Sequence, residues 1–304
     1  RDNITVNAVS TNNAIDYSQA INSSSGNVSL NGGITTQRGV YNSAASTITA
    51  NNITILGTSS AVPVWIVQLG AMTINSTAIG GSISVTGNYI GTPGALGGVY
   101  QIGTITGASG SNISFISNNN ISQNGAITLA ANGSGTASSI TYDTTSGNKT
   151  STITSGALTI ASGSTSAINY IMKSNGSALS PPAITVPGYI LLDNTCLGCG
   201  TPATAATAAV NGNAITLGGA LSAGTLAGTT GVTVNTVANG TGNGFNQGGN
   251  AISSSSGGVT ITTNGQTGTG YSSSGSITAT GQAITITTTT TTTGSGIYDT
   301  GTIT

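Results

Sequence analysis

A five-residue phrase recurs along the chain and constrains its fold more than any other feature. In each copy, Gly or another small residue leads into an alternation of apolar and Ser or Thr residues. The copies are GNVSL (26–30), NNITI (51–55), GAMTI (70–74), GSISV (81–85), SNISF (111–115), GAITL (125–129), GALTI (156–160), NAITL (213–217), GVTVN (231–235), GVTIT (258–262) and QAITI (282–286). A period of two residues is typical of a β-strand with one buried face.

The apolar members of the phrase are predicted to form the core, because alternate side chains of a strand point to opposite faces. The inward pairs are Val28 and Leu30, Ile53 and Ile55, Ile127 and Leu129, Leu158 and Ile160, Val259 and Ile261, and Ile284 and Ile286. The Ser and Thr residues between them are predicted to face outward.

Aromatic residues return at a nearly constant spacing and indicate the length of the repeating unit. From Tyr17 to Tyr170 the intervals are 24, 24, 24, 26, 27 and 28 residues, and Phe245, Tyr271 and Tyr298 resume at 26 and 27. The 75 residues from Tyr170 to Phe245 fit three more units. Short repeats built from strands and turns favour a β-solenoid over a propeller, whose blades need about 40 to 50 residues.

The predicted fold is therefore all-β: residues 1–304 form a single segment of an elongated β-solenoid, a right-handed parallel β-helix of about 12 coils. Each coil is expected to contain roughly 24 to 28 residues. Residues 298–304 begin a further unit without finishing it, so we expect the chain to continue or to stack end to end.

Composition excludes several other classes of protein. The chain has 47 Gly, four Lys and Arg, five Asp and no His, with a net charge of −1. Helix is disfavoured by the Gly, Thr, Ser and Asn content, and disorder by the low charge. Four cations cannot neutralise several phosphates, so nucleic acid is not an expected partner. The longest apolar run, residues 61–67, is too short to span a membrane.

A threonine run at residues 287–293 could belong to a disordered tract or to a folded coil. The preceding residues Ile284 and Ile286 keep the strand alternation, which predicts that Thr285 and Thr287 face outward. The later threonines are predicted to carry the chain around a corner to Gly294. The run is therefore expected to be folded.

The phrases GNVSL, GAITL, GALTI and GVTIT, in a chain rich in Gly, Asn, Thr and Ser, resemble the passenger regions of filamentous-haemagglutinin-type exoproteins and related autotransporter adhesins. The resemblance covers nearly the whole chain. It implies a secreted, non-catalytic rod on a bacterial cell surface that serves attachment or biofilm matrix formation. Host-surface or matrix glycans are the ligands that it implies.

Residues 173–202 depart from the repeat and are predicted to form a loop insertion or an irregular coil. They hold four of the six prolines and both cysteines, Cys196 and Cys199. A structural zinc site needs four ligands, and this chain offers two thiols and no His, so we expect no metal. A local disulfide is favoured over free thiols, and a link between neighbouring subunits is the remaining alternative.

The acidic residues give no sign of an active site. They are Asp2, Asp16, Asp143, Asp193 and Asp299, each in a different predicted coil. A polysaccharide-acting enzyme on a β-helix needs clustered acids, which this spacing does not set up. An Asp that caps its own turn explains those beside Tyr17, Tyr142 and Tyr298. We expect no catalytic residues and no cofactor.

Small, uncharged residues occupy the outward positions of the phrase and predict a flat, neutral stripe. The candidate stripe residues are Thr128, Thr159, Thr216, Thr260, Thr262, Thr285 and Thr287. Exposed β surfaces normally carry charges, so such a stripe either packs laterally against another rod or is tolerated because the coils are already fully paired; lateral packing is the favoured interpretation. A flat threonine array also resembles ice-binding solenoids, although two outward threonines per coil occur clearly only at residues 260–262 and 285–287.

Overall fold

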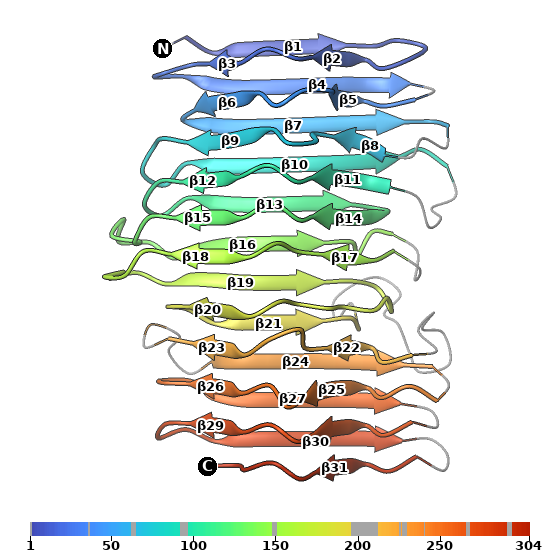
Figure 1. Cartoon of the computed structure of the whole chain (residues 1–304), viewed down its shortest axis with the longest axis vertical. Helices are drawn as coiled ribbons and strands as arrows, with labels where there is room; N and C mark the ends of the chain where they lie inside the picture. The colour runs from blue at the N-terminus through green and yellow to red at the C-terminus, as the bar shows by residue number, and fades with distance from the viewer. Residues whose placement is uncertain are drawn as a thin grey trace. The chain divides into compact units, whose positions relative to one another are not determined.

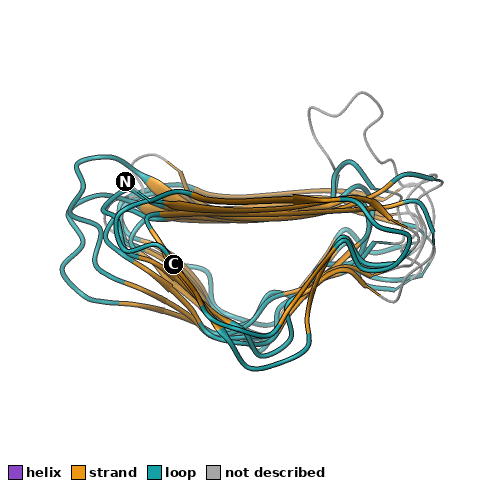
Figure 2. Cartoon of the chain, turned by 90° about the horizontal axis from the view of Figure 1, so that it is seen from above, coloured by secondary structure: helices purple, strands orange, loops and turns teal. Residues whose placement is uncertain are grey.

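In the computed structural model the described residues form parallel β-strands wound into a β-solenoid, and none of them is helical. The structure describes residues 2–35, 37–61, 65–91, 97–147, 151–195, 212–224, 226, 230–239, 241–265, 268–290 and 294–304. Within that part of the chain, no helix could cross a membrane. The chain divides into two compact units, Arg1–Ser166 and Ala167–Thr304. In each unit the coils have three sides, which we call long, second and third in chain order (Figures 1 and 2).

The described residues of the first unit form six strands on each of its three sides. The long side contains β1 (Ile4–Ala8), β4 (Asn27–Thr35), β7 (Asn52–Ser59), β10 (Ser82–Tyr89), β13 (Asn112–Ser117) and β16 (Ser138–Asp143). The second side contains β2 (Ile15–Tyr17), β5 (Val40–Asn42), β8 (Trp65–Gln68), β11 (Gly97–Gln101), β14 (Asn120–Gln123) and β17 (Ile153–Thr154). The third side contains β3 (Ile21–Asn22), β6 (Thr47–Ala50), β9 (Thr73–Ser76), β12 (Ile105–Gly107), β15 (Ile127–Leu129) and β18 (Leu158–Ile160).

The second unit repeats this arrangement with fewer strands among its described residues. Its long side contains β19 (Ile168–Lys173), β21 (Ile190–Asp193), β24 (Thr230–Ala238), β27 (Gly258–Gly265) and β30 (Ile284–Thr290). Its second side contains β22 (Ile215–Thr216), β25 (Phe245–Gly248), β28 (Tyr271–Ser273) and β31 (Ile297–Asp299). Its third side contains β20 (Ile184–Val186), β23 (Leu221–Ala223), β26 (Ile252–Ser254) and β29 (Ile277–Ala279).

The core of the first unit consists of apolar columns, as the phrase predicted. On the long side, one column contains Ile4, Val28, Ile53, Ile83, Ile113 and Ile140. On the second side the column contains Ile15, Val40, Val67, Val99, Ile121 and Ile153. On the third side it contains Ile21, Ile48, Ile74, Ile105, Ile127 and Leu158. Burying one such side chain contributes about 1.5 to 3 kcal/mol, so each added coil stabilises the stack.

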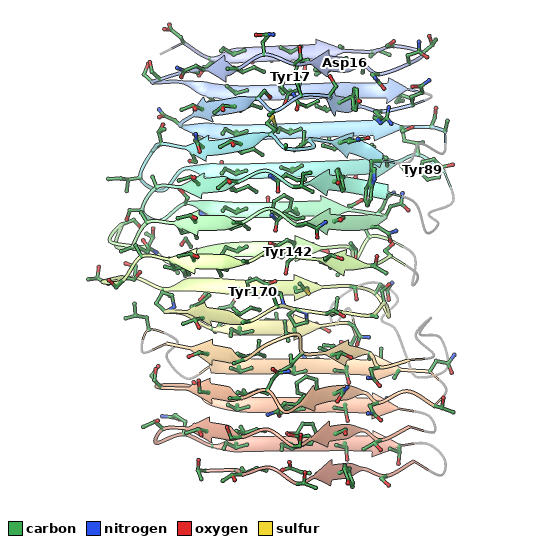
Figure 3. The ribbon with its side chains drawn as sticks, in the orientation of Figure 1. Asp16, Tyr17, Tyr89, Tyr142 and Tyr170 are labelled. Atoms are coloured by element: carbon green, nitrogen blue, oxygen red, sulfur yellow. The ribbon has the colours of Figure 1, made fainter. Side chains whose placement is uncertain are left out.

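Aromatic residues widen the core at some coils. Phe115 and Tyr142 stack in the first unit with ring centroids 5.3 Å apart, and Phe245 and Tyr271 stack in the second at 5.8 Å. All four side chains are buried. In Figure 3, Tyr142 lies within the coils, whereas Tyr89 projects past the end of β10.

The expected count of 12 coils is too high. The described residues include eleven strands on the long sides of the two units, which correspond to about ten turns. Coil length varies more than the aromatic spacing predicted, because Tyr170 pairs with Ile190 after 20 residues and Ile190 pairs with Val232 after 42. The interval from Tyr170 to Phe245 that suggested three units therefore holds one short coil, one long coil and the first part of a third.

The regular aromatic spacing does not mark one position in the coil. Tyr41 and Trp65 lie on the second side, Tyr89 and Phe115 on the long side, and Phe245 again on the second side. The spacing predicted the period because every side shares the same repeat, not because the rings form one column.

Most of the threonine run continues the strand rather than turning a corner. β30 extends through Thr290, and Thr288 pairs with Thr263 of β27. Thr285 and Thr287 are exposed, as predicted. Residues 291–293 lie outside the described residues, and Thr290 Oγ1 donates a hydrogen bond to the carbonyl oxygen of Gly294.

Residues 173–195 form part of an unusually short coil. Leu179 makes an isolated parallel bridge to Ile215, after which β20 and β21 complete the turn of the chain. Residues 196–211, with Cys196 and Cys199, lie outside the described residues. The predicted disulfide therefore stays a prediction, as does the single-segment organisation of residues 1–304.

Glycine allows two sides of the second unit to meet closely at one corner. Inward threonines of the long side face glycines that precede the second side; the threonines are Thr236, Thr263 and Thr288, and the glycines are Gly244, Gly270 and Gly296. A Cβ atom on any of these glycines would lie within 3.0 Å of a threonine side chain. A larger residue at this corner therefore requires movement of a threonine side chain, and at Gly244 or Gly270 of the neighbouring backbone as well.

We predict that Gly270→Ala lowers the free energy of unfolding by about 1 to 3 kcal/mol, because overpacking forces neighbouring groups apart. The new Cβ would lie 2.7 Å from the Gly296 carbonyl oxygen and 2.8 Å from Thr263 Oγ1. Gly249→Ala is the matched control, since its Cβ would meet only Ser274 Oγ at 3.9 Å. Urea unfolding followed by circular dichroism measures both. Equal stability of the two variants would contradict this account of the corner.

Candidate functional site

Three of the acidic residues, Asp143, Asp193 and Asp299, cap local turns. Asp143 Oδ1 accepts hydrogen bonds from the backbone N–H and the hydroxyl of Thr145, and Asp193 does the same with Thr195. Asp299 Oδ1 accepts the N–H of Gly301. Each is a carboxylate that stabilises the turn after its own strand, as predicted for Asp143 and Asp299.

Asp16 is held differently, because its carboxylate accepts a hydrogen bond from Asn13 Nδ2 at 3.1 Å. Figure 3 shows Asp16 beside Tyr17 on β2. Within the described ranges, no three His, Cys, Asp or Glu side chains lie close enough together to hold a metal ion.

The third side carries a small, uncharged outward column in both units. In the first unit one outward column contains Asn22, Thr49, Asn75, Thr106, Thr128 and Thr159. In the second unit the equivalent column contains Thr185, Ser222, Ser253 and Thr278. We call these residues the third-side column. These residues are small and uncharged in both units. In the first unit, Thr106, Thr128 and Thr159 each follow a small exposed residue two positions earlier in the chain; these residues are Thr104, Ala126 and Ala157.

The seven predicted stripe threonines do not form a single stripe. Thr128 and Thr159 are neighbours in the third-side column. Thr260 pairs with Thr285 and Thr262 with Thr287, but on the long side of the second unit. Thr216 lies on the second side, in β22, and is half-buried. The phrase occurs on all three sides, so its outward residues face three directions.

Aromatic side chains gather on the second side of the first unit, which the repeated phrase does not predict. One outward column there contains Asp16, Tyr41, Gln68, Tyr100, Ser122 and Thr154. Trp65 lies against Tyr100, with ring centroids 5.2 Å apart and planes at 32°. The signal that could have revealed it is the alternation Val40-Tyr41-Asn42, in which Tyr occupies the outward position that elsewhere holds Ser or Thr.

Buried glutamines that hold the bend between the second and third sides were also missed. Gln123 Nε2 donates to the carbonyl oxygen of Gly125 at 2.6 Å, and its Oε1 accepts the hydroxyl of Tyr142 at 2.8 Å. In the second unit Gln247 Nε2 donates to the Asn250 carbonyl at 2.7 Å, and its Oε1 accepts the hydroxyl of Tyr271 at 2.6 Å. These side chains satisfy groups that a bend would otherwise bury without partners.

Burial raises the pKa of Tyr271 to about 12. The hydrogen bond with Ser273 opposes this shift and the nearby charge of Asp299 adds to it. Burial also raises the pKa of Tyr17, whose hydroxyl donates to the sulfur of Met72. Both phenols are therefore held neutral inside the coils.

We predict that the free energy of unfolding falls as pH rises from about 10 to about 12, because Tyr271 loses its proton more readily in the unfolded chain. Tyr271 alone accounts for up to about 2 kcal/mol of this loss. Tyr271→Phe should be less stable than the native protein at pH 8 but should show a shallower decline above pH 10. Tyr298→Phe, at a 61% exposed position, is the control and should keep the native slope. Urea unfolding at several pH values measures the free energy of unfolding of all three proteins. The same decline with pH above 10 in all three would contradict the assignment of this loss to Tyr271.

In comparisons with protein-family models, with curated proteins and with solved structures, none matched the chain.

Proposed function

We propose that this chain is a structural, non-catalytic segment of a bacterial extracellular adhesive filament or surface adhesin. The observation that carries the proposal is the third-side column, which is small and uncharged in both units and stands on a regular parallel sheet. Charges that would keep such sheets apart are missing from this column, so it suits lateral contact with a second copy of the chain. The resemblance to filamentous-haemagglutinin-type passengers supports attachment and a cell-surface location.

Self-association is part of this proposal, laterally through the third side or end to end. Parallel strands at a sheet edge present unpaired N–H and C=O groups, which pair readily with another strand. Neutral outward columns lower the electrostatic cost of bringing two copies together. Bundled fibres are the assembly that these surfaces favour.

The proposal predicts fibres or rods in negative-stain electron microscopy of the purified protein and of material from its native source. Thr106→Lys combined with Thr128→Lys should abolish lateral bundles, because it places neighbouring charges in the third-side column. Thr260→Lys combined with Thr285→Lys places neighbouring charges on the long side and serves as the control. Loss of bundles in the control alone would assign lateral contact to the long side. Compact particles without elongation would refute the filament proposal.

Ice binding is a second candidate, favoured by hydroxyl groups repeated at the spacing of the strands. Thr106, Thr128 and Thr159 are consecutive and exposed on the third side, and Thr260 and Thr285 are neighbours on the long side. Adjacent strands are about 4.8 Å apart, so such threonines form a regular array.

Ice growth in a dilute solution of the protein separates the two candidates. If the protein is an adhesive filament, ice crystals should grow round and unshaped, as they do in a control solution of bovine serum albumin. Faceted crystals that become round again in the Thr106→Lys and Thr128→Lys double variant would favour ice binding instead.

A further inference from the structure

Three aromatic side chains form an outward surface on the second side of the first unit. Strands β5, β8 and β11 follow one another on the second side (Figure 1). They contain Tyr41, Trp65 and Tyr100, and all three side chains are half-buried. Gln68 pairs in register with Tyr41 on one neighbouring strand and with Tyr100 on the other. We call Tyr41, Trp65, Gln68 and Tyr100, with the adjacent Arg38, the aromatic face.

The planar groups of the aromatic face are already arranged against one another. The rings of Trp65 and Tyr100 are in contact, with centroids 5.2 Å apart. The guanidinium carbon of Arg38 lies 4.6 Å from the centroid of the Tyr41 ring, a cation–π geometry. Side chains held by such contacts lose little conformational freedom when a ligand binds.

Stability of the coil does not account for this surface. The second side already has its buried column of Val40, Val67 and Val99. Outward positions on the third side are occupied by Thr, Ser and Asn in every coil of the same stack. A cross-strand pair contributes only about 0.2 to 1 kcal/mol, which small hydroxyl residues also supply. Partly exposed Trp, Tyr and Arg side chains grouped together are instead typical of binding surfaces.

The charge of the aromatic face points to an uncharged ligand. Among the described residues of this column, Asp16 is the one acidic side chain, and it lies in register beside Tyr41. Arg38 supplies one positive charge, which the Tyr41 ring already contacts. The two opposite charges leave no net field that would attract an anionic chain. Complementarity therefore favours a neutral ligand with flat apolar faces and hydrogen-bonding edges.

We infer that the aromatic face binds neutral carbohydrate chains. A pyranose ring has a C–H face that stacks on Trp and Tyr rings, and hydroxyl groups at its edge. Gln68 lies between the two tyrosines and offers both a donor and an acceptor to those hydroxyls. Tyr41 and Tyr100 are two strand spacings apart, about 10 Å, which accommodates more than one sugar unit. The inference deepens the proposed adhesive function, on which it rests, by naming the ligand class and the side of the coil that binds it.

Trp65 is the only tryptophan of the chain, so its fluorescence reports directly on this surface. The intact protein is titrated separately with cellohexaose, maltohexaose, mannohexaose and xylohexaose, and with a heparin hexasaccharide as an anionic comparison. At least one neutral hexasaccharide should shift the emission saturably. Tyr100→Ala should weaken that binding at least about tenfold, because a central aromatic contact is lost.

Matched variants separate binding from folding. Tyr41→Phe keeps the ring and should bind within about twofold of the native protein, whereas Tyr41→Ala should not. Tyr298→Ala, at an exposed tyrosine of the second unit, should leave binding unchanged. Trp65→Ala is measured by calorimetry, and circular dichroism confirms that each variant keeps its strands.

Binding of the heparin fragment alone, or of no hexasaccharide, would overturn the carbohydrate assignment. So would neutral binding that survives both Tyr100→Ala and Trp65→Ala. Fibres without binding of any hexasaccharide would support the filament proposal and would contradict carbohydrate binding by the aromatic face. Hexasaccharide binding by particles that form neither rods nor fibres would support the carbohydrate assignment and would contradict the filament proposal.

Discussion

The whole structure depends on parallel pairing of each coil with the next in register. When Ile53 pairs with Val28 on one side and Ile83 on the other, their side chains must stack, so a change of residue type in one coil is felt by both neighbours. The central inward columns are therefore aliphatic or aromatic, whereas inward positions near the corners also hold Thr and Ser. Bends are secured by side chains such as Gln123 and Gln247 that hydrogen-bond to the backbone. Close corners require Gly on one side wherever Thr occupies the other.

The sequence was sufficient to predict the strands, the inward residues and the solenoid, because two-residue alternation and in-register stacking are local properties repeated many times. Val28, Ile127 and Val259 are buried as the phrase predicted. The side of the coil on which a phrase lies could not be predicted, because GSISV and GAITL have the same pattern but form β10 on the long side and β15 on the third. The side depends on turn lengths, which vary from coil to coil.

Because the side of the coil could not be predicted for each phrase, neither the threonine stripe nor the aromatic face could be predicted correctly. Thr128 and Thr159 are neighbours, whereas Thr216 and Thr260 lie on other sides, so a stripe predicted from the phrase alone mixed three surfaces. The aromatic face could not be predicted because the spacing of Tyr41 and Trp65 indicates the period of the repeat but not the direction of their side chains. Register information resolves both cases, since it fixes which residues of distant phrases share a column.

The scarcity of ionisable groups on the outward columns has an environmental consequence. With no His, five carboxylates and tyrosines such as Tyr271 that stay protonated to about pH 12, little in the coils changes charge between mild acid and mild alkali. Interactions that do not depend on ionic attraction are also weakly screened by dissolved salt. A surface of this kind would keep its contacts in fresh water, brine or acidified fluid. An adhesive that depends on ionic attraction would bind with a different strength in each of these media.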